Sequence, residues 1–283
     1  MSSVVPLVSI IIPCYNHGQY ITEALESVGQ FKEKSLLEII VINDGSTDDF
    51  TNNLLEKLSS SCTVIHQENK GLAATRNAGI KASKGKYILP LDADNKIEPG
   101  YISKALELME QNGNIDIVYS NAFLFGDNKE EILWAGPFNL QRLMLGNYID
   151  ACACFRKEVW IKNNGYDENL TAILPGLEDW EFWMHAAFNG FGFEYINEPL
   201  FYYRVVKGSM LHQLKSKKAG NVEVVEYLIK KHDKFFGPQY IDRDIMRKVD
   251  AGLIALVGKI ILKKYFPSTF EKMVRKGKLR RYI

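Results

Sequence analysis

The sequence predicts an α/β protein built on a doubly wound, mostly parallel sheet. Strand-like and helix-like segments alternate through residues 8–120, and this order builds parallel sheets by right-handed crossovers. The apolar run before Asp92 is uninterrupted, which is typical of a strand covered on both faces. That strand ends in Asp92-Ala93-Asp94, and ligands of open α/β sheets bind just beyond the carboxyl ends of their strands.

The alternation changes character at about residue 120. Before it, we expect strands at 8–13, 37–43, 62–66, 86–91 and 116–120, with helices at 20–30, 48–59, 71–83 and 99–112. After it, shorter strands at 132–135, 151–155 and 193–203 mix with helices at 140–145, 157–163 and 178–189. One amphipathic helix is expected over 215–236, and basic helices follow it.

The 283 residues carry a formal net charge of +1, a balance that gives no indication of nucleic acid as a partner. The charge is uneven, because residues 243–283 contain 12 Lys and Arg against 3 Asp and Glu. Within this tail the apolar run 251–262 is flanked by cations, a pattern typical of helices that lie on anionic lipid. A helix packed on the core with a solvated basic end explains the pattern equally well.

The four cysteines are expected to be small buried hydrophobes in a reducing cytosol, because no Cys or His spacing indicates zinc. The N-terminus lacks the basic and long apolar regions of a signal peptide, and the run 251–262 is too short to span a bilayer. We therefore expect a cytoplasmic protein, with or without peripheral contact at the inner face of the membrane.

The ends of the first two strands exclude the two common phosphate-binding loops. Residues 13–18 read Pro-Cys-Tyr-Asn-His-Gly where a dinucleotide fold has Gly-x-Gly-x-x-Gly, and no P-loop is present. The second strand ends in Asn43-Asp-Gly-Ser-Thr-Asp48, where Gly45 permits a sharp turn and the hydroxyls after it are placed to cap the next helix. Asp44 is then free at the strand tip to accept an N–H of a base, unless it is only a turn residue.

Charged residues in two further segments are expected at the same edge of the sheet, where the strands end. The helix expected at 71–83 has small residues that permit close packing on the sheet, and Arg76 would project toward the strand ends. Its fork of donors suits a base carbonyl or a phosphate; a solvated surface charge is the alternative. The oxygens of Asp92 and Asp94, with no His or Cys nearby, suit Mg²⁺ or Mn²⁺ bridging phosphates, although an acidic pair after a strand is common.

Together these motifs resemble those of the family-2 inverting glycosyltransferases of the GT-A fold. The matching segments are Pro13–Asn16, Asn43–Asp48, Asn69–Gly79 and Asp92–Asp94, in the family's order and spacing. The resemblance implies a Rossmann-like GT-A domain at 1–205, with a nucleotide-binding half at 1–120 and a mixed acceptor half at 121–205. A flexible loop and a helical basic extension would occupy 206–283.

The resemblance also implies roles for individual residues at the strand ends. The residues that would hold the nucleotide, usually uridine, are Pro13, Tyr15, Asp44 and Arg76. Asp92 would contact the ribose side of the donor. Asp94 would be the metal ligand of the Asp-x-Asp pair, with Mn²⁺ or Mg²⁺ as the cofactor.

An inverting transfer needs a stabilised diphosphate leaving group, a base for the acceptor hydroxyl, and alignment of the two. The best candidate for the base segment is Gly176–Trp183, whose acids stand at the first turn of an expected helix. The family places its base in this Glu-Asp pair, which makes Asp179 the expected base and Glu178 its neighbour in the acceptor pocket. In isolation such acids are often only helix-capping residues. Trp180 and Trp183 either stack on sugars or belong to the core.

The segment after the base helix is similar to the family's strand end and flexible loop. Arg204 would contact the donor diphosphate, and His212 would complete the metal site in a closed state, although a loop His is more often simply exposed. Many relatives carry Arg where this chain has His185, so the resemblance does not supply a phosphate-pairing cation on the base helix. No Gln-x-x-Arg-Trp follows, and we therefore expect one sugar to be added per encounter.

The leading hypothesis is a metal-dependent glycosyltransferase that moves a hexose or N-acetylhexosamine from a nucleotide sugar, above all a UDP-sugar. Its acceptor would be a saccharide, lipid-linked or other hydroxyl in the synthesis of cell-surface polysaccharide or glycoconjugate. A sugar-1-phosphate nucleotidyltransferase would begin with a Gly-rich loop, which residues 13–18 do not supply. A non-catalytic nucleotide-sugar binding module would be expected to lose Asp94 or Asp179, and both are present.

Overall fold

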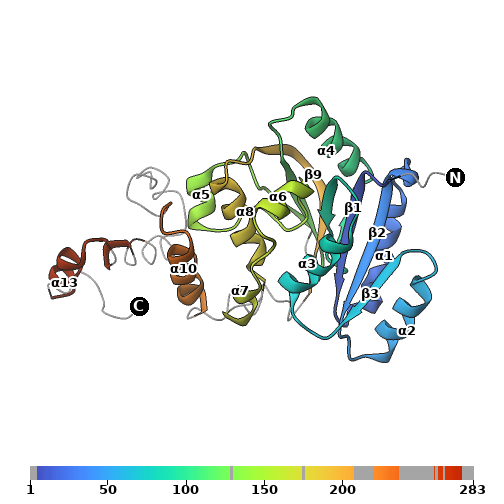
Figure 1. The fold of residues 1–283 in the computed structure, drawn as a ribbon, viewed down its shortest axis with the longest axis horizontal. Coiled ribbons are helices and arrows are strands. Elements are labelled where there is room, and N and C mark those ends of the chain that lie inside the picture. Colours follow the sequence, from blue (N-terminus) through green and yellow to red (C-terminus); the bar gives the residue numbers. More distant parts are fainter. Residues whose placement is uncertain are drawn as a thin grey trace. The chain divides into compact units, whose positions relative to one another are not determined.

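The computed structural model describes residues 5–127, 130–173, 176–206, 220–235, 258, 261–263 and 265–275. The chain forms two compact units, one of residues 1–138 and 149–209 and one of residues 139–148 and 210–283. The larger unit contains the sheet (Figure 1). The expected acceptor half is interrupted, because residues 139–148 belong to the smaller unit.

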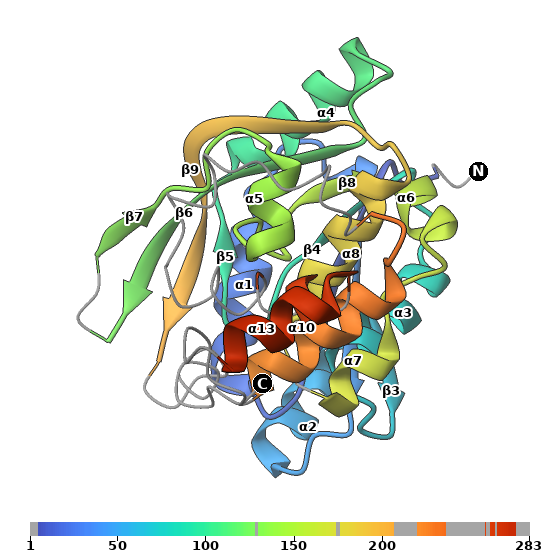
Figure 2. The same cartoon turned by 90° about the vertical axis from the view of Figure 1, so that its left-hand side faces the viewer.

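Within the described residues, one mixed sheet runs through the larger unit. Its strands in spatial order are β3 (Thr63–Gln67), β2 (Leu37–Asp44), β1 (Val8–Cys14), β4 (Tyr87–Pro90), β8 (Cys154–Arg156), β6 (Ile117–Gly126), β9 (Phe193–Val205) and β5 (Lys96–Ile97). The first four are parallel, as expected, whereas β8 is antiparallel to both of its neighbours. A further strand, β7 (Glu131–Leu133), pairs with β6, which lies between β7 and β9 in Figure 2.

The connections between the strands are mostly helical. The helices of the larger unit are α1 (Gly18–Gly29), α2 (Asp49–Leu58), α3 (Leu72–Ala82), α4 (Gly100–Gln111), α6 (Lys157–Lys162), α7 (Glu168–Ile173) and α8 (Glu178–Phe188), with a 3₁₀ turn at Lys34–Leu36. The expected helices and strands of this unit are confirmed to within about three residues, except that β6, expected at 116–120, continues to Gly126. β5 and α7 have no counterpart among the expected elements, because neither is long enough to show a hydrophobic period.

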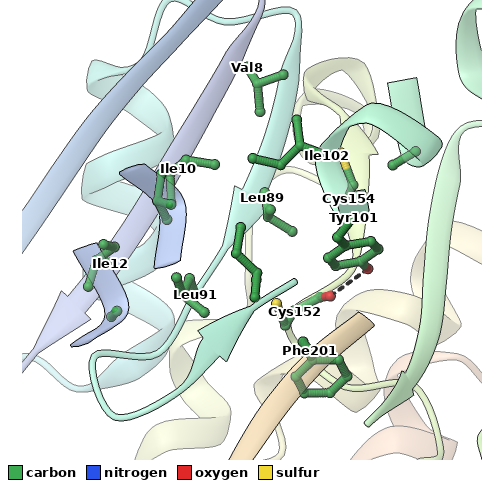
Figure 3. Close-up of a cluster of buried hydrophobic side chains, with 14 of the residues drawn as sticks. Val8, Ile10, Ile12, Leu89, Leu91, Tyr101, Ile102, Cys152, Cys154 and Phe201 are labelled. Atoms are coloured by element: carbon green, nitrogen blue, oxygen red, sulfur yellow. Dashed lines mark hydrogen bonds between the residues drawn. The ribbon is translucent and has the colours of Figure 1, made fainter. Parts of the chain in front are cut away.

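β1 and β4 are buried along their whole length and β2 in its second half, which is why these segments read as apolar runs, whereas the edge strand β3 is partly exposed. Successive residues of β1 point to opposite faces, so that Val8 and Ile10 join a cluster with α1 and α4, whereas Ile11 faces α3. Figure 3 shows part of this cluster, where the hydroxyl of Tyr101 donates a hydrogen bond to the carbonyl oxygen of Cys152 at 2.7 Å. This bond ties α4 to the segment that leads into β8.

α3 packs closely on the sheet, as its small residues predict. A Cβ atom on Gly79 would lie 2.5 Å from Cδ1 of Ile42 and 2.6 Å from Cγ2 of Ile11, so a larger residue would push the helix away. One turn earlier on the same helix, Arg76 is 1% exposed. The close packing therefore brings a cation into the interior at the carboxyl ends of the strands.

The four cysteines are free thiols, as the sequence predicts. Cys14, Cys152 and Cys154 are buried as expected, whereas Cys62 is only half-buried. Burial raises the pKa of Cys14 to about 11 and that of Cys154 to about 12. At neutral pH these thiols stay protonated and act as small core side chains.

The smaller unit contains α5 (Leu140–Leu145), α10 (Gly220–Lys231) and α13 (Pro267–Arg275). α10 lies within the helix expected at 215–236, and it buries Val224 and Leu228. Most of the apolar run 251–262 and of the basic tail lies outside the described residues, so the expected lipid contact stays a prediction. In the part of the chain that the structure describes, no helix combines the length and the apolar character needed to cross a bilayer.

Candidate active site

The loops that follow β1 and β2 are joined by the side chain of Asn16. Its Oδ1 accepts hydrogen bonds from the backbone N–H of Thr47 at 2.7 Å and of Asp48 at 3.3 Å, and its Nδ2 donates to Oγ1 of Thr47. Asp48 caps α2 by accepting from the N–H of Thr51 at 2.7 Å, so the cap lies just after the hydroxyls expected for it. The two predicted nucleotide-binding loops are therefore held together at one edge of the sheet.

Tyr15 and Pro13 belong to the first of these loops. Pro13 is buried at the end of β1, whereas Tyr15 is 44% exposed. An exposed aromatic ring at the carboxyl edge of a sheet is suited to stack on a planar base. Contact of either residue with a nucleotide stays a prediction.

Asp44 is not free at the tip of β2, contrary to the expectation from the sequence. Its Oδ1 accepts hydrogen bonds from Nε2 of Gln67 at 2.7 Å and from the backbone N–H of Lys70 at 2.8 Å. Its Oδ2 accepts from the N–H of Gly71 at 2.9 Å. The reason is the parallel register, which places Gln67 opposite Asp44 and brings the start of α3 beside the carboxylate. Of about four acceptor positions on a carboxylate, this leaves one for a ligand.

Arg76 of α3 connects the end of β4 to the start of α8. Its Nη2 lies 2.6 Å from Oδ1 of Asp92, and its Nη1 donates to Oε1 of Glu178. The side chains of Arg76 and Glu178 are 1% and 3% exposed. Burial opposes the charged guanidinium, but the two carboxylates outweigh it and raise the pKa of Arg76. The alternative of a solvated surface charge is therefore excluded, and Arg76 joins the predicted donor side to the predicted base segment.

Asp92 and Asp94 are both half-buried in the turn that follows β4. Burial, and after it the charge of Asp92, raises the pKa of Asp94 to about 6. Among the described residues, no cluster of three or more His, Cys, Asp or Glu side chains is placed to hold a metal ion by itself. The pair nevertheless fits Mg²⁺ or Mn²⁺, because such ions take one or two carboxylates and complete their coordination with substrate phosphates and water.

α8 carries the candidate base in its first turn. Asp179 is half-buried, and its Oδ1 accepts a hydrogen bond from the N–H of Trp180 at 2.7 Å. Burial raises the pKa of Asp179 well above its usual range, and the charges of Glu178 and Asp150 act in the same direction. A carboxylate of raised basicity is suited to accept a proton from a hydroxyl. Trp180 and Trp183 are 5% and 0% exposed, so both belong to the core.

Arg204, near the end of β9, lies beside the turn that carries the acidic pair. Its Nε donates to the main-chain oxygen of Asp94 at 2.8 Å, and its Nη2 is 3.0 Å from Oε2 of Glu23. The side chain is 12% exposed. A contact between Arg204 and a diphosphate stays a prediction. His212 lies outside the described residues, and its role as a metal ligand stays a prediction as well.

Asp150, which precedes β8, was missed by the reasoning from sequence. Its Oδ1 accepts a hydrogen bond from the N–H of Cys152 at 2.8 Å. Burial, and after it the charge of Asp92, raises the pKa of Asp150 to about 7, and the charge of Asp94 adds to this. Asp150 therefore lies within electrostatic range of Asp92 and Asp94. The sequence feature that could have indicated Asp150 is an acidic residue immediately before the apolar run 151–155.

We expect Asp150→Asn to raise the free energy of unfolding above pH 7. An aspartate whose pKa is raised by folding destabilises the protein above its unfolded pKa, because the unfolded chain releases a proton that the folded protein retains. With a shift from 3.8 to about 7, the gain should grow between these two pH values and reach up to about 4 kcal/mol. Asn keeps the acceptor for the N–H of Cys152. Urea unfolding of both proteins near pH 4 and near pH 8 measures the gain, and an equal gain at both would contradict a charge effect.

Comparison with known proteins supports the family resemblance that these motifs indicate. A family model described as Glycosyl transferase family 2 matches residues 9–162, more than half of the chain. EpsH of Bacillus subtilis (strain 168) is 30% identical over 224 residues, which cover 75% of this chain and 64% of EpsH. The matched part thus spans less than two thirds of that relative.

Two solved structures share the fold of this chain. The complex of S. aureus TarS with UDP-GlcNAc has a TM-score of 0.63 at 18% identity, covering 98% of this chain and 94% of that chain. The mannosyltransferase PcManGT from Pyrobaculum calidifontis, in complex with GDP-Man and Mn²⁺, has a TM-score of 0.60 at 14% identity, covering 98% and 76%. These likenesses confirm the GT-A fold expected from the sequence. With its family match over residues 9–162, the chain belongs to glycosyl transferase family 2.

Proposed function

We propose that this chain is a metal-dependent, inverting glycosyltransferase that moves one sugar from a UDP-sugar to a hydroxyl group. The observation that carries the proposal is the buried contact of Arg76 with both Asp92 and Glu178. One side chain thereby joins the loop expected to hold the donor to the helix expected to supply the base. A transfer reaction requires donor and acceptor to be aligned, and a shared buried cation fixes that alignment before any substrate binds.

The nucleotide would bind along the carboxyl ends of β1 and β2. Tyr15 offers an exposed ring for stacking, and Asp44 retains one acceptor position for an N–H of the base. The backbone N–H groups of Lys70 and Gly71, which donate to Asp44, lie at the start of α3. This arrangement suits a planar base with a donor N–H, such as uracil. The UDP-GlcNAc and GDP-Man complexes of the two structural neighbours support a nucleotide-sugar donor.

Asp94, with Asp92 beside it, would hold Mg²⁺ or Mn²⁺ at the donor diphosphate. The Mn²⁺ complex of PcManGT supports this choice of ion. When bound, the ion would act as the Lewis acid that stabilises the departing diphosphate. Asp92 would keep its bond to Arg76, so the geometry of the pair depends on α3 as well as on the turn.

Asp179 would accept the proton of the acceptor hydroxyl. Its raised pKa makes it a stronger base than an ordinary aspartate, and the charge of Glu178, which pairs with Arg76, contributes to that rise. Attack from the side of the sugar opposite the diphosphate would invert the anomeric centre. The acceptor would be a saccharide or lipid-linked saccharide of cell-surface polysaccharide or glycoconjugate synthesis. We place the reaction in the cytoplasm, with the basic C-terminal tail as a contact for anionic lipid.

Thermal unfolding with UDP, GDP, CDP, TDP and ADP, each with and without Mn²⁺, tests the proposal. We expect stabilisation by UDP that increases with Mn²⁺. A ligand at 100 times its dissociation constant stabilises the folded protein by roughly 2.7 kcal/mol, which shifts the melting temperature by several degrees. Asp94→Ala should keep any metal-independent shift and lose the part that depends on Mn²⁺.

The other outcomes distinguish the alternatives. Stabilisation by GDP or TDP instead of UDP would keep the enzyme class and change the donor. No stabilisation by any nucleotide would contradict the proposal. Binding of UDP without sugar transfer to any acceptor would favour a nucleotide-sugar binding module of the same fold.

A further inference from the structure

Arg204 is held in one orientation by three side chains. Its guanidinium carbon lies 4.5 Å from the ring centroid of Tyr20 and 4.4 Å from that of Phe125. Its Nη2 is 3.0 Å from Oε2 of Glu23, which in turn lies 3.3 Å from Nζ of Lys96. The two rings lie at cation–π distance from the guanidinium, and Glu23 attracts it by charge, although Nη2 of Arg204 makes no hydrogen bond with any described residue.

The same residue contacts the acidic turn at two points. Nε of Arg204 donates to the main-chain oxygen of Asp94 at 2.8 Å, and the backbone N–H of Arg204 donates to Oδ1 of Asn95 at 2.9 Å. Asn95 is 2% exposed, and its own N–H closes the turn on the carbonyl oxygen of Asp92 at 2.9 Å. The main chain beside the Asp94 side chain is therefore fixed by a residue 110 positions away in the sequence.

We propose that Arg204 is a positioning residue for the Asp94 carboxylate and that Glu23 orients Arg204. The inference rests on the proposed function, because it takes Asp94 as the metal ligand. It replaces the role suggested by the sequence, in which Arg204 binds the donor diphosphate. A phosphate bound at Nη2 would compete with Glu23 for the charge of Arg204, while Nε stays bonded to the main-chain oxygen of Asp94.

The two roles place different demands on residue 204. A phosphate contact needs a positive charge, which Lys supplies nearly as well as Arg. Positioning needs the directed donors and the flat shape of a guanidinium, which Lys lacks. Glu23 separates the roles further: it supports a positioning Arg204, whereas it competes with a phosphate for a binding Arg204. Removal of its charge should therefore weaken the site in the first case and strengthen phosphate binding in the second.

The test is the dissociation constant of UDP, measured by calorimetry with and without Mn²⁺ for wild type, Arg204→Lys and Glu23→Gln. We expect both variants to lose roughly 10–100-fold of the Mn²⁺-dependent affinity, as is usual when a group that orients a metal ligand is removed. UDP affinity without Mn²⁺ should stay unchanged. The melting temperature of Glu23→Gln without ligand should also stay unchanged, because the Glu23 side chain is 44% exposed.

Glu198→Gln is the matched control, because it breaks a similarly exposed ion pair with Lys104 and should bind as wild type does. Tighter UDP binding by Glu23→Gln, or unchanged Mn²⁺ dependence in both variants, would overturn the proposal. If Arg204→Lys does not fold, Glu23→Gln decides alone. If the UDP affinity of the wild-type protein does not change with Mn²⁺, the proposed metal dependence is itself contradicted, whatever the variants show.

Discussion

Asp179→Asn is expected to lower kcat for sugar transfer by roughly 10²–10⁴-fold while leaving UDP binding intact. The amide keeps the size of the side chain and the acceptor for the N–H of Trp180, but it cannot take a proton from a hydroxyl. Steady-state transfer measured with saturating donor, together with calorimetric binding of UDP, separates the two effects. Asp49→Asn is a suitable control, because Asp49 also stands in the first turn of a helix, α2, and is exposed.

The pH dependence of the same reaction gives a second measure of Asp179. A base must be unprotonated to act, so the rate should rise with pH through its pKa. Because burial raises that pKa, the acidic limb of the wild-type profile should lie above the range of an ordinary aspartate. The residual activity of Asp179→Asn should lack this limb. A wild-type rate that is already constant from pH 4 upward, or normal transfer by the variant, would assign the base elsewhere.

Arg76→Met should lower the free energy of unfolding by roughly 3–5 kcal/mol, the usual effect of removing one partner from a buried ion pair. Met fills most of the space of the side chain, so the loss reports the missing charge more than a cavity. Glu178, at 3% exposure, would be left without its cation. Chemical denaturation at neutral pH measures the change, and sugar transfer should be lost together with the connection between the turn after β4 and α8.

Lys86→Met provides the matched comparison, because Lys86 pairs with Glu110 at 2.8 Å but both side chains are about half exposed. Exposed pairs contribute about 0–1 kcal/mol, so this variant should be nearly as stable as wild type. Adding Glu178→Gln to Arg76→Met should restore part of the stability, since the unpaired charge is then removed. An Arg76→Met variant as stable as the Lys86→Met control would contradict the prediction, because it would mean that the charge of Glu178 does not need Arg76 as its partner.

The parallel part of the fold could be predicted because β1 and β2 are long and largely apolar, as Val8, Ile10 and Ile11 illustrate, and because helices alternate with all four strands. A strand at 151–155 is expected from the sequence, but the antiparallel place of β8 between β4 and β6 could not be predicted, because a strand of three residues shows too little pattern to indicate its partners. The same limit hid β5, with two residues.

The residue types of the candidate site could be predicted from motifs, but their partners could not. The motif that contains Asp44 gives no sign that the parallel register would supply it with three donors from residues 67–71. The motif of Arg76 likewise gives no sign of Glu178, which lies 102 positions away. Asp150 belongs to no motif, and its raised pKa arises from its burial in the folded chain and, after that, from the charges of Asp92 and Asp94. Long-range pairing of this kind is decided by tertiary packing.

The insertion of β8 between β4 and β6 has a consequence for how the chain is synthesised. One edge of β4 pairs with β1, and its other edge is closed by β8, through Tyr87 with Arg156 and Ile88 with Phe155. A nascent chain that ends before β8 presents an apolar strand with an open edge, which is a template for aggregation. We therefore expect the open edge of β4 to stay unpaired during synthesis until residues 154–156 have emerged from the ribosome. The strands before residue 120 and the strands after it accordingly lie in one compact unit.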